Sequence, residues 1–277
     1  MFFPFAILDL QLKRHAWVTW FLVFINLAIF LWTTQFSPVE HHWLVAHYGF
    51  IPQRLSQVST HKPLVVPFEF QYILKDGART TYSKGTCHVA NSTKGLVCST
   101  VSYMFLHSSW LHVLMNMWFL LLFGRAVENE LGHTGFLFFY LLGGILAALT
   151  QWLAYPHSLV PVIGASGALA AVLGAFAMLM PQARVKTFVF VIIYIAIWDI
   201  PAIAFLIFWF LVQVVSGLGE YSNLSLFART APVAWWVHVG GFVAGMWMML
   251  ILMKWKLWLK RRWNIQGRPP LQPRGES

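Results

Sequence analysis

Residues 164–180 read GASGALAAVLGAFAMLM, a stretch of small and apolar side chains with no charged group. As a helix, the part from Ser166 to Met180 is about 22 Å long, somewhat less than the roughly 30 Å hydrocarbon core of a bilayer. Of the 277 residues, 58% are hydrophobic and 10% are charged. In soluble domains about 45–50% of the residues are apolar and about 25% are charged. We therefore expect an integral membrane protein.

Charge-free windows of similar character predict six transmembrane helices and an all-α fold. They cover Ala16–Phe36, Met104–Phe123, Gly135–Tyr155, Ser166–Met180, Pro201–Leu218 and Pro232–Met253. A further apolar segment, Thr187–Trp198, is too short to cross a bilayer and is rich in β-branched and aromatic residues. We expect it to lie at the cytoplasmic interface, and a longer fifth helix that begins inside it is the alternative.

The net charge of +10 suggests nucleic acid as a partner, but the positions of the basic residues indicate membrane topology instead. Many Lys and Arg residues follow the last predicted span, whereas the short loops on the opposite side contain only Arg229. Because basic residues concentrate on the cytoplasmic side, near anionic lipid, we expect both termini there. This topology gives a cytoplasmic N-terminus (1–15), a transmembrane domain (16–253) with a long extracytoplasmic first loop (37–103), and a basic, disordered cytoplasmic tail (254–277).

The first loop contains Cys87 and Cys98, the two cysteines of the chain. In an oxidising compartment they form a disulfide or remain two free thiols, and the sequence leaves both open. The loop histidines His41, His42 and His47 resemble a solvated cluster more than a metal site. Two cysteines without a repeated Cys/His spacing exclude a zinc finger and a disulfide scaffold.

Strongly polar side chains interrupt three of the predicted spans, where such groups are costly and often functional. Ser166 begins the fourth span, and the rise per residue places it about 8 Å below the outer surface if the inner end lies at the cytoplasmic interface. His238 lies six residues into the last span, at about 9 Å. A hydrogen bond between helices explains either residue alone, but their equal depth suggests that they meet.

The second span adds His107, His112 and Asn116. His112 and Asn116 are four residues apart and share a helix face. If Ser109 caps this helix, Asn116 lies about 10 Å deep, in the same layer as the serine and the histidine.

Small residues favour close packing of the fourth and sixth predicted helices. Gly174 continues the face of Ser166, and Gly241 and Gly245 share a face with His238. Small residues at four-residue spacing let helix backbones approach closely in lipid. This closeness is what a hydrogen bond between Ser166 and His238 requires.

These residue types fit acyl transfer. A serine hydroxyl becomes a good nucleophile when a neutral imidazole takes its proton. The Asn116 amide, His112 and the backbone N–H groups at the start of the Ser166 helix are donors for a developing oxyanion. No aspartate lies inside a predicted span, so a Ser–His dyad is the expected machinery. Zinc is disfavoured because the chain has no HExxH motif and no carboxylate in the polar layer.

The sequence resembles the rhomboid intramembrane serine proteases, in their bacterial six-helix form, between about Met104 and Met253. The resemblance rests on His107-x4-His112-x3-Asn116, Ala126-Val127-Glu128 with Gly132, Gly164-Ala165-Ser166-Gly167 with Gly174, and His238-x2-Gly241-x3-Gly245.

The resemblance implies a nucleophile (Ser166), a general base (His238) and an oxyanion site (His112 and Asn116). The implied reaction is hydrolysis of peptide bonds in or near transmembrane segments of substrate proteins. It implies no cofactor. From the residues themselves we expect membrane lipid and no nucleic acid as partners and no metal, and we expect the protein to lie in a bacterial inner membrane. Two features differ from the family pattern: the first loop lacks a Trp-Arg pair, and Ala170 stands where an aromatic residue often lies beneath the histidine.

A noncatalytic rhomboid-like protein that binds transmembrane clients is the competing function. Such relatives typically lack the serine or the histidine, and this chain has both. A small transporter fits less well, because the polar groups lie toward one surface and no paired repeat is visible.

Overall fold

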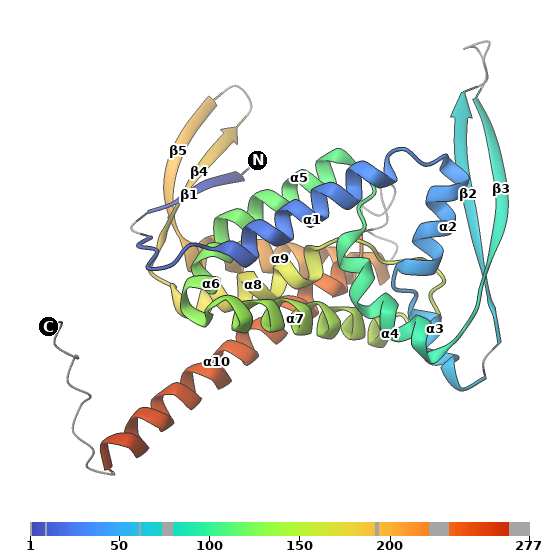
Figure 1. Cartoon of the computed structure of the whole chain (residues 1–277). Helices are drawn as coiled ribbons and strands as arrows, with labels where there is room; N and C mark the ends of the chain where they lie inside the picture. Colours follow the sequence, from blue (N-terminus) through green and yellow to red (C-terminus); the bar gives the residue numbers. More distant parts are fainter. Residues whose placement is uncertain are drawn as a thin grey trace, which may run out of the picture.

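The computed structural model describes residues 2–8, 10–60, 62–73, 80–191, 194–221 and 233–265, and it is mostly helical (Figure 1). In chain order the elements are β1 (Phe2–Ile7), α1 (Trp17–Thr33), α2 (Pro38–Tyr48), α3 (Pro52–Ser56), η1 (Val58–Thr60), β2 (Leu64–Ile73), β3 (Thr80–Val89), α4 (Thr93–Ser102), η2 (Tyr103–Phe105), α5 (Trp110–Phe119), η3 (Leu120–Gly124), α6 (Arg125–Leu131), α7 (His133–Ala154), α8 (Ser166–Leu179), β4 (Arg184–Val191), β5 (Tyr194–Pro201), α9 (Ala202–Tyr221) and α10 (Trp235–Ile265).

Each of the six predicted spans contains a helix. Four helical stretches are long and apolar enough to cross a membrane: Trp110–Leu131, His133–Ala154, Ala202–Glu220 and Trp235–Trp258. The first of these is a continuous helical stretch that consists of α5, a π-helical turn (η3) and α6. The two remaining apolar helices, α1 and α8, are shorter.

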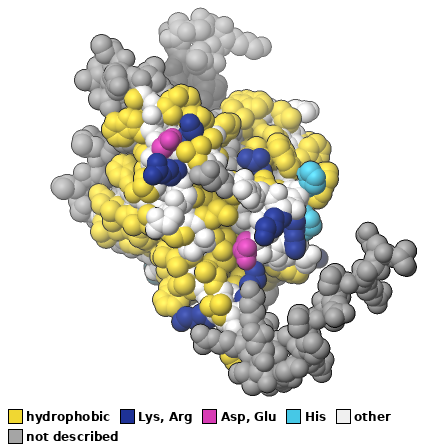
Figure 2. All heavy atoms as spheres, turned by 90° about the vertical axis from the view of Figure 1, so that its left-hand side faces the viewer, with side chains coloured by type: hydrophobic (Ala, Val, Ile, Leu, Met, Phe, Trp, Pro, Cys, Tyr) yellow, Lys and Arg dark blue, Asp and Glu magenta, His cyan; other side chains and the backbone are white. Residues whose placement is uncertain are grey.

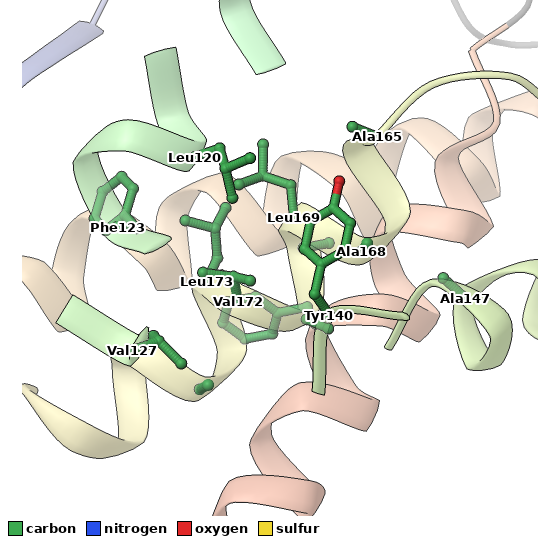
Figure 3. Close-up of a cluster of buried hydrophobic side chains, with 14 of the residues drawn as sticks. Leu120, Phe123, Val127, Tyr140, Ala147, Ala165, Ala168, Leu169, Val172 and Leu173 are labelled. Atoms are coloured by element: carbon green, nitrogen blue, oxygen red, sulfur yellow. The ribbon is translucent and has the colours of Figure 1, made fainter. Parts of the chain in front are cut away.

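Helix α8 lies in the middle of the bundle and carries much of its core. Every residue from Gly167 to Ala177 is buried. Figure 3 shows Leu169, Val172 and Leu173 of this helix among side chains from other helices, including Phe123 and Tyr140. A helix surrounded on all sides needs no polar face, which explains its uniformly small and apolar sequence.

Glycines bring α8 and α10 into backbone contact, as their spacing predicts. A Cβ on Gly245 would overlap the carbonyl oxygen of Ala171, and one on Gly241 would overlap that of Gly167. In the opposite direction, a Cβ on Gly174 would overlap the carbonyl oxygen of Phe242. Any larger residue at these positions would push the two helices apart.

The expectation of an all-α fold is wrong, because two small antiparallel sheets flank the helices. One has the order β1-β4-β5, and the other is the hairpin β2-β3. The segment Thr187–Trp198 contributes to β4 and β5, so the alternative of a longer fifth helix is also wrong. Val185, Thr187 and Val189 alternate inward along β4, which is the two-residue period that suits β-branched side chains.

The first loop is folded rather than irregular. Its helix α2 begins with a capping box of Ser37 and Glu40, and a small core of its own lies beneath the hairpin. This core consists of Ala46, Ile51, Leu64, Val66, Cys87 and Val89. Both cysteines are free, so the disulfide is absent from the structure. Two of the loop histidines stack on aromatic rings, His42 on Phe68 and His47 on Trp43.

The two ends of the described chain lie at the same end of the bundle, opposite the β2-β3 hairpin (Figure 1). Trp118 donates to the carbonyl oxygen of Pro4 at 2.8 Å, and Lys256 pairs with Glu130 at 2.6 Å. Helix α10 continues past Met253 to Ile265, so this part of the predicted disordered tail is helical. Residues 266–277 and Pro232 lie outside the described residues.

Candidate active site

Ser166 and His238 meet at the beginnings of two adjacent helices. Ser166 is the first residue of α8, and His238 lies in the first turn of α10. The serine Oγ is 2.9 Å from Nε2 of the histidine. Both residues are half-buried.

A third polar group contacts the histidine from helix α9. The Oε1 atom of Gln213 lies 2.8 Å from Nδ1 of His238, and the Nε2 group of Gln213 donates to the carbonyl oxygen of Trp209 at 3.2 Å. Gln213 is buried. The three side chains Ser166, His238 and Gln213 therefore form one hydrogen-bonded chain across α8, α10 and α9.

The carbonyl of Trp209 fixes the direction of this chain. A backbone carbonyl only accepts, so the amino group of Gln213 faces Trp209 and its oxygen faces His238. An oxygen acceptor at Nδ1 requires that Nδ1 carries the hydrogen. In a neutral imidazole Nε2 is then the acceptor, and Ser166 donates its hydroxyl hydrogen to it. This is the tautomer that a general base needs.

Gly164 shapes the turn before Ser166. Its φ of +119° lies in the region that favours glycine. A Cβ on Gly164 would lie only 2.6 Å from Nε2 of His112 and 3.7 Å from Nδ2 of Asn116. The absence of a side chain therefore lets both polar groups approach the backbone two residues before the serine.

Asn116 and His112 both come from α5, whose N-cap is Ser109, as predicted. The Nδ2 group of Asn116 is buried and has no hydrogen-bond partner among the described residues. Leaving such a donor unpaired costs about 1–3 kcal/mol, so this donor is available to an oxygen beside Ser166. The Nδ1 atom of His112 lies 3.1 Å from the hydroxyl of Ser108.

His107 supports the turn from behind. It is buried, and its Nε2 accepts the backbone N–H of Ala165 at 3.4 Å. Its ring packs edge-on against His112, with 5.0 Å between the ring centroids. His107 therefore contacts both the turn before Ser166 and the ring of His112.

Comparison with known protein families shows which family the chain belongs to. The family model described as "Rhomboid domain" matches residues 94–255, which is more than half of the chain. The chain belongs to the rhomboid family. Taken with its apolar helices, this membership makes it a multi-pass integral membrane protein.

Three curated rhomboid proteins share shorter stretches with the chain. It is 44% identical over 77 residues to Rhomboid-like protein 11, chloroplastic, of Arabidopsis thaliana, covering 28% of this chain and 26% of that protein. It is 38% identical over 96 residues to Rhomboid protein 1, mitochondrial, of Saccharomyces cerevisiae. This match covers 33% of this chain and 28% of that protein. It is 33% identical over 82 residues to Presenilin-associated rhomboid-like protein A, mitochondrial, of Danio rerio. This match covers 29% of this chain and 21% of that protein.

The matched stretches thus span about a quarter of the length of these rhomboid relatives. Their names assign them to chloroplasts and mitochondria, and they give no support to the expected place in a bacterial inner membrane.

In this rhomboid chain, Gln213 is the site residue that the sequence analysis missed. It is a strongly polar side chain inside the predicted span Pro201–Leu218, and its polarity there was a usable signal. Two tryptophan rings also lie near His238, although the small Ala170 gave no reason to expect aromatic neighbours there. Trp209 lies 6.0 Å and Trp235 lies 6.3 Å from the histidine, measured between ring centroids.

Across the described residues, no three His, Cys, Asp or Glu side chains are grouped as ligands. The rhomboid site is thus built from neutral donors and acceptors on α5, α8, α9 and α10.

Proposed function

We propose that this rhomboid-family chain is an intramembrane serine endopeptidase that hydrolyses peptide bonds in or near transmembrane segments of other proteins. The observation that carries the proposal is the hydrogen-bonded chain from Ser166 through His238 to Gln213. A protein that only binds transmembrane helices has no need for a serine that donates to an imidazole acceptor.

In the proposed reaction, His238 Nε2 takes the hydroxyl proton as Ser166 Oγ attacks the carbonyl carbon of the scissile bond. The carbonyl π bond breaks and leaves a negative charge on the oxygen. Asn116 Nδ2 and the Ser166 end of α8 supply donors for this oxyanion, and His112 joins them if its Nε2 carries a hydrogen. The carbonyl then re-forms as the C–N bond breaks, the imidazolium gives its proton to the leaving amine, and an ester to Ser166 remains.

Water completes the cycle in the same geometry. His238 removes a proton from a water molecule, the hydroxide attacks the ester carbonyl, and the proton returns to Ser166 Oγ as the acid product leaves. Gln213 does not touch the reacting atoms. Its oxygen holds the Nδ1–H and stabilises the imidazolium that forms in each half of the reaction, so it is a positioning residue.

The proposal includes a six-span topology with both termini in the cytoplasm and the first loop outside. Both ends of the described chain lie opposite the first-loop hairpin (Figure 1), and the bridge between Phe50 and Val162 links the first loop to the turn before Ser166. The site then lies toward the extracytoplasmic surface, where water is available for hydrolysis.

The test uses the full chain in proteoliposomes with a model transmembrane substrate. Ser166→Ala and His238→Ala are each expected to abolish cleavage while insertion and thermal stability are retained, and Ser166→Ala is expected to lose labelling by a fluorophosphonate. Ser158→Ala, a serine in the loop before the site, is the matched control and should cleave normally. Normal cleavage by either site variant would refute the protease function and favour a noncatalytic client-binding protein.

A further inference from the structure

Two hollows lie side by side where helix α1 begins, at the end of the bundle opposite the active site. The first has a volume of about 260 Å³ and is lined by basic side chains, Lys13, Arg14, His15 and Arg125, together with Trp20. The second has a volume of about 180 Å³ and shares Trp20 and Arg125 with the first.

The first hollow is cationic. Among the described residues no carboxylate pairs with Lys13, Arg14 or Arg125. The Arg125 Nε donates to the carbonyl oxygen of Leu121 at 2.7 Å, and this fixes the stem while the two terminal amino groups have no partner in the described structure.

The neighbouring acidic residues on α6 are already engaged. The buried Glu128 accepts hydrogen bonds from the first turn of α1 and from His133, and Glu130 pairs with Lys256. The positive charge of the hollow is therefore not neutralised by the part of the protein that the structure describes.

The chain segment around the hollow is held in place by Asn129. Its Oδ1 accepts the backbone N–H of Lys13 at 2.7 Å and of Arg14 at 3.2 Å. These bonds tie the residues before α1 to helix α6, and they orient two basic side chains beside Arg125. The site is thus made of segments far apart in the sequence.

The second hollow is apolar. Its other lining side chains are Phe5, Trp118, Leu121 and Leu122, from β1, α5 and η3. Trp118 is fixed by its hydrogen bond to Pro4 and by stacking on Phe3, with 5.5 Å between the ring centroids. A charged hollow thus adjoins an apolar one, and Trp20 and Arg125 line both.

We propose that these hollows bind one anionic phospholipid of the surrounding bilayer, with its phosphate in the basic hollow and an acyl chain in the apolar one. Basic pockets at the end of membrane helices suit anionic headgroups, and tryptophan is enriched at this level of the membrane. Figure 2 shows Lys and Arg side chains set among apolar ones on the face that carries the β1-β4-β5 sheet. A free anion would use the basic hollow alone and would leave the groove empty.

The experiment compares the full chain in phosphatidylcholine nanodiscs with and without phosphatidylglycerol, by native mass spectrometry of retained lipid and by thermal stability. Wild type should retain one phosphatidylglycerol and should melt at higher temperature when it is present, because a ligand of the folded state stabilises it. Neither measurement depends on proteolysis, so the result is independent of the proposed function.

The triple variant Lys13→Gln/Arg14→Gln/Arg125→Gln should lose both effects. Each basic residue near an anionic surface contributes about 1 kcal/mol, which is roughly a fivefold loss of affinity per charge. If removal of Arg125 prevents folding, the exposed pair Lys13→Gln/Arg14→Gln provides the same test. The matched control, Lys254→Gln/Lys260→Gln/Arg261→Gln, removes three charges from α10, leaves the Lys256–Glu130 pair in place and should retain the lipid.

Three outcomes would overturn the proposal. Equal loss in the α10 control would show general attraction between a basic protein and an anionic surface. Equal stabilisation of wild type by inorganic phosphate would show an anion site without an acyl-chain groove. Equal retention of phosphatidylcholine and phosphatidylglycerol would show that the basic hollow does not select the headgroup.

Discussion

Gln213 and His238 are joined by a 2.8 Å contact between the amide oxygen of one and Nδ1 of the other. The contact crosses from α9 to α10, and the bond from Gln213 to the Trp209 carbonyl sets its direction. The glutamine occupies the position that a carboxylate has in a Ser–His–Asp triad. It orients the ring without placing a negative charge inside the membrane, where a carboxylate would be costly.

Replacement of Gln213 by leucine is expected to lower kcat while KM changes little. A hydrogen bond to a charged group contributes about 1.5–3 kcal/mol, and the imidazolium of the transition state would lose it, so we expect a loss of about 10- to 150-fold. Gln213→Glu retains an acceptor for Nδ1–H and should recover rate relative to the leucine variant, but it should lower thermal stability because it buries a carboxylate and loses the donor to the Trp209 carbonyl. Steady-state kinetics on a transmembrane substrate measure both. A leucine variant with wild-type kcat would show that the glutamine serves packing only.

Gly245→Ala is expected to destabilise the protein by about 1–3 kcal/mol, the usual cost of overpacking. The new Cβ would overlap the carbonyl oxygen of Ala171, and a backbone atom cannot move aside cheaply. Cleavage should fall with stability as α8 and α10 separate. The control is Gly135→Ala in α7, where the nearest atom to a new Cβ is 3.5 Å away, and which should be neutral or slightly stabilising. Equal melting temperatures for the two variants would contradict this packing.

Glu128→Gln and Glu130→Gln are the same substitution on one helix, with different expected results. The Glu128 carboxylate is buried and accepts from Val18 N–H at 2.9 Å, from Thr19 N–H at 2.8 Å and from His133 Nδ1 at 2.6 Å. An amide would turn a donor toward a donor, so we expect a loss of about 2–3 kcal/mol. The Glu130 pair with Lys256 is half-exposed and should contribute less than about 1 kcal/mol. Thermal unfolding of the two variants in one detergent compares their stabilities. Equal losses of stability would show that the bonds from Glu128 to the first turn of α1 contribute no more than the surface pair.

The features of this fold that could be predicted from the sequence are those that depend on local patterns of residues. Each of the six apolar stretches contains a helix, and four of these helices are long and apolar enough to cross a membrane. The inferred depths of Ser166 and His238 predicted their contact. The pairing of β1 with β4 was missed because it joins residues 2–7 to residues 184–191, and no local pattern records such a distant partner. The neighbouring β4 and β5 form a local hairpin, and the β-branched residues at two-residue spacing in β4 were a usable signal for it. Gln213 was missed because one amide in an apolar helix acquires its role only when α9 packs beside α10.

The two cysteines provide a test of topology. Cys98 is exposed and Cys87 is buried, and burial raises the pKa of the Cys87 thiol. A raised pKa keeps the thiol protonated to higher pH, so Cys87 should react slowly at neutral pH and faster only as the pH rises. A membrane-impermeant maleimide applied to intact cells should therefore label wild type and Cys87→Ser but scarcely label Cys98→Ser. Labelling of Cys98 only after permeabilisation would reverse the proposed topology.

Asn116→Ala separates stabilisation of the oxyanion from nucleophilic attack. The buried Nδ2 of Asn116 has no partner in the described structure and lies near the Gly164 backbone. Removal of one oxyanion donor costs about 10²–10³ in rate, whereas removal of the nucleophile ends covalent catalysis. Asn116→Ala should therefore cleave slowly and still react with a fluorophosphonate, and His112→Ala should behave similarly.

A buried asparagine on another helix serves as the control for this prediction. Asn26 donates its amide N–H to the carbonyl oxygen of Leu22 within α1, so Asn26→Ala should alter stability without a specific loss of kcat. If Asn116→Ala instead cleaves at the wild-type rate, the asparagine is a packing residue. The oxyanion would then depend on His112 and on the backbone N–H groups at the Ser166 end of α8, because those are the other donors of the proposed site.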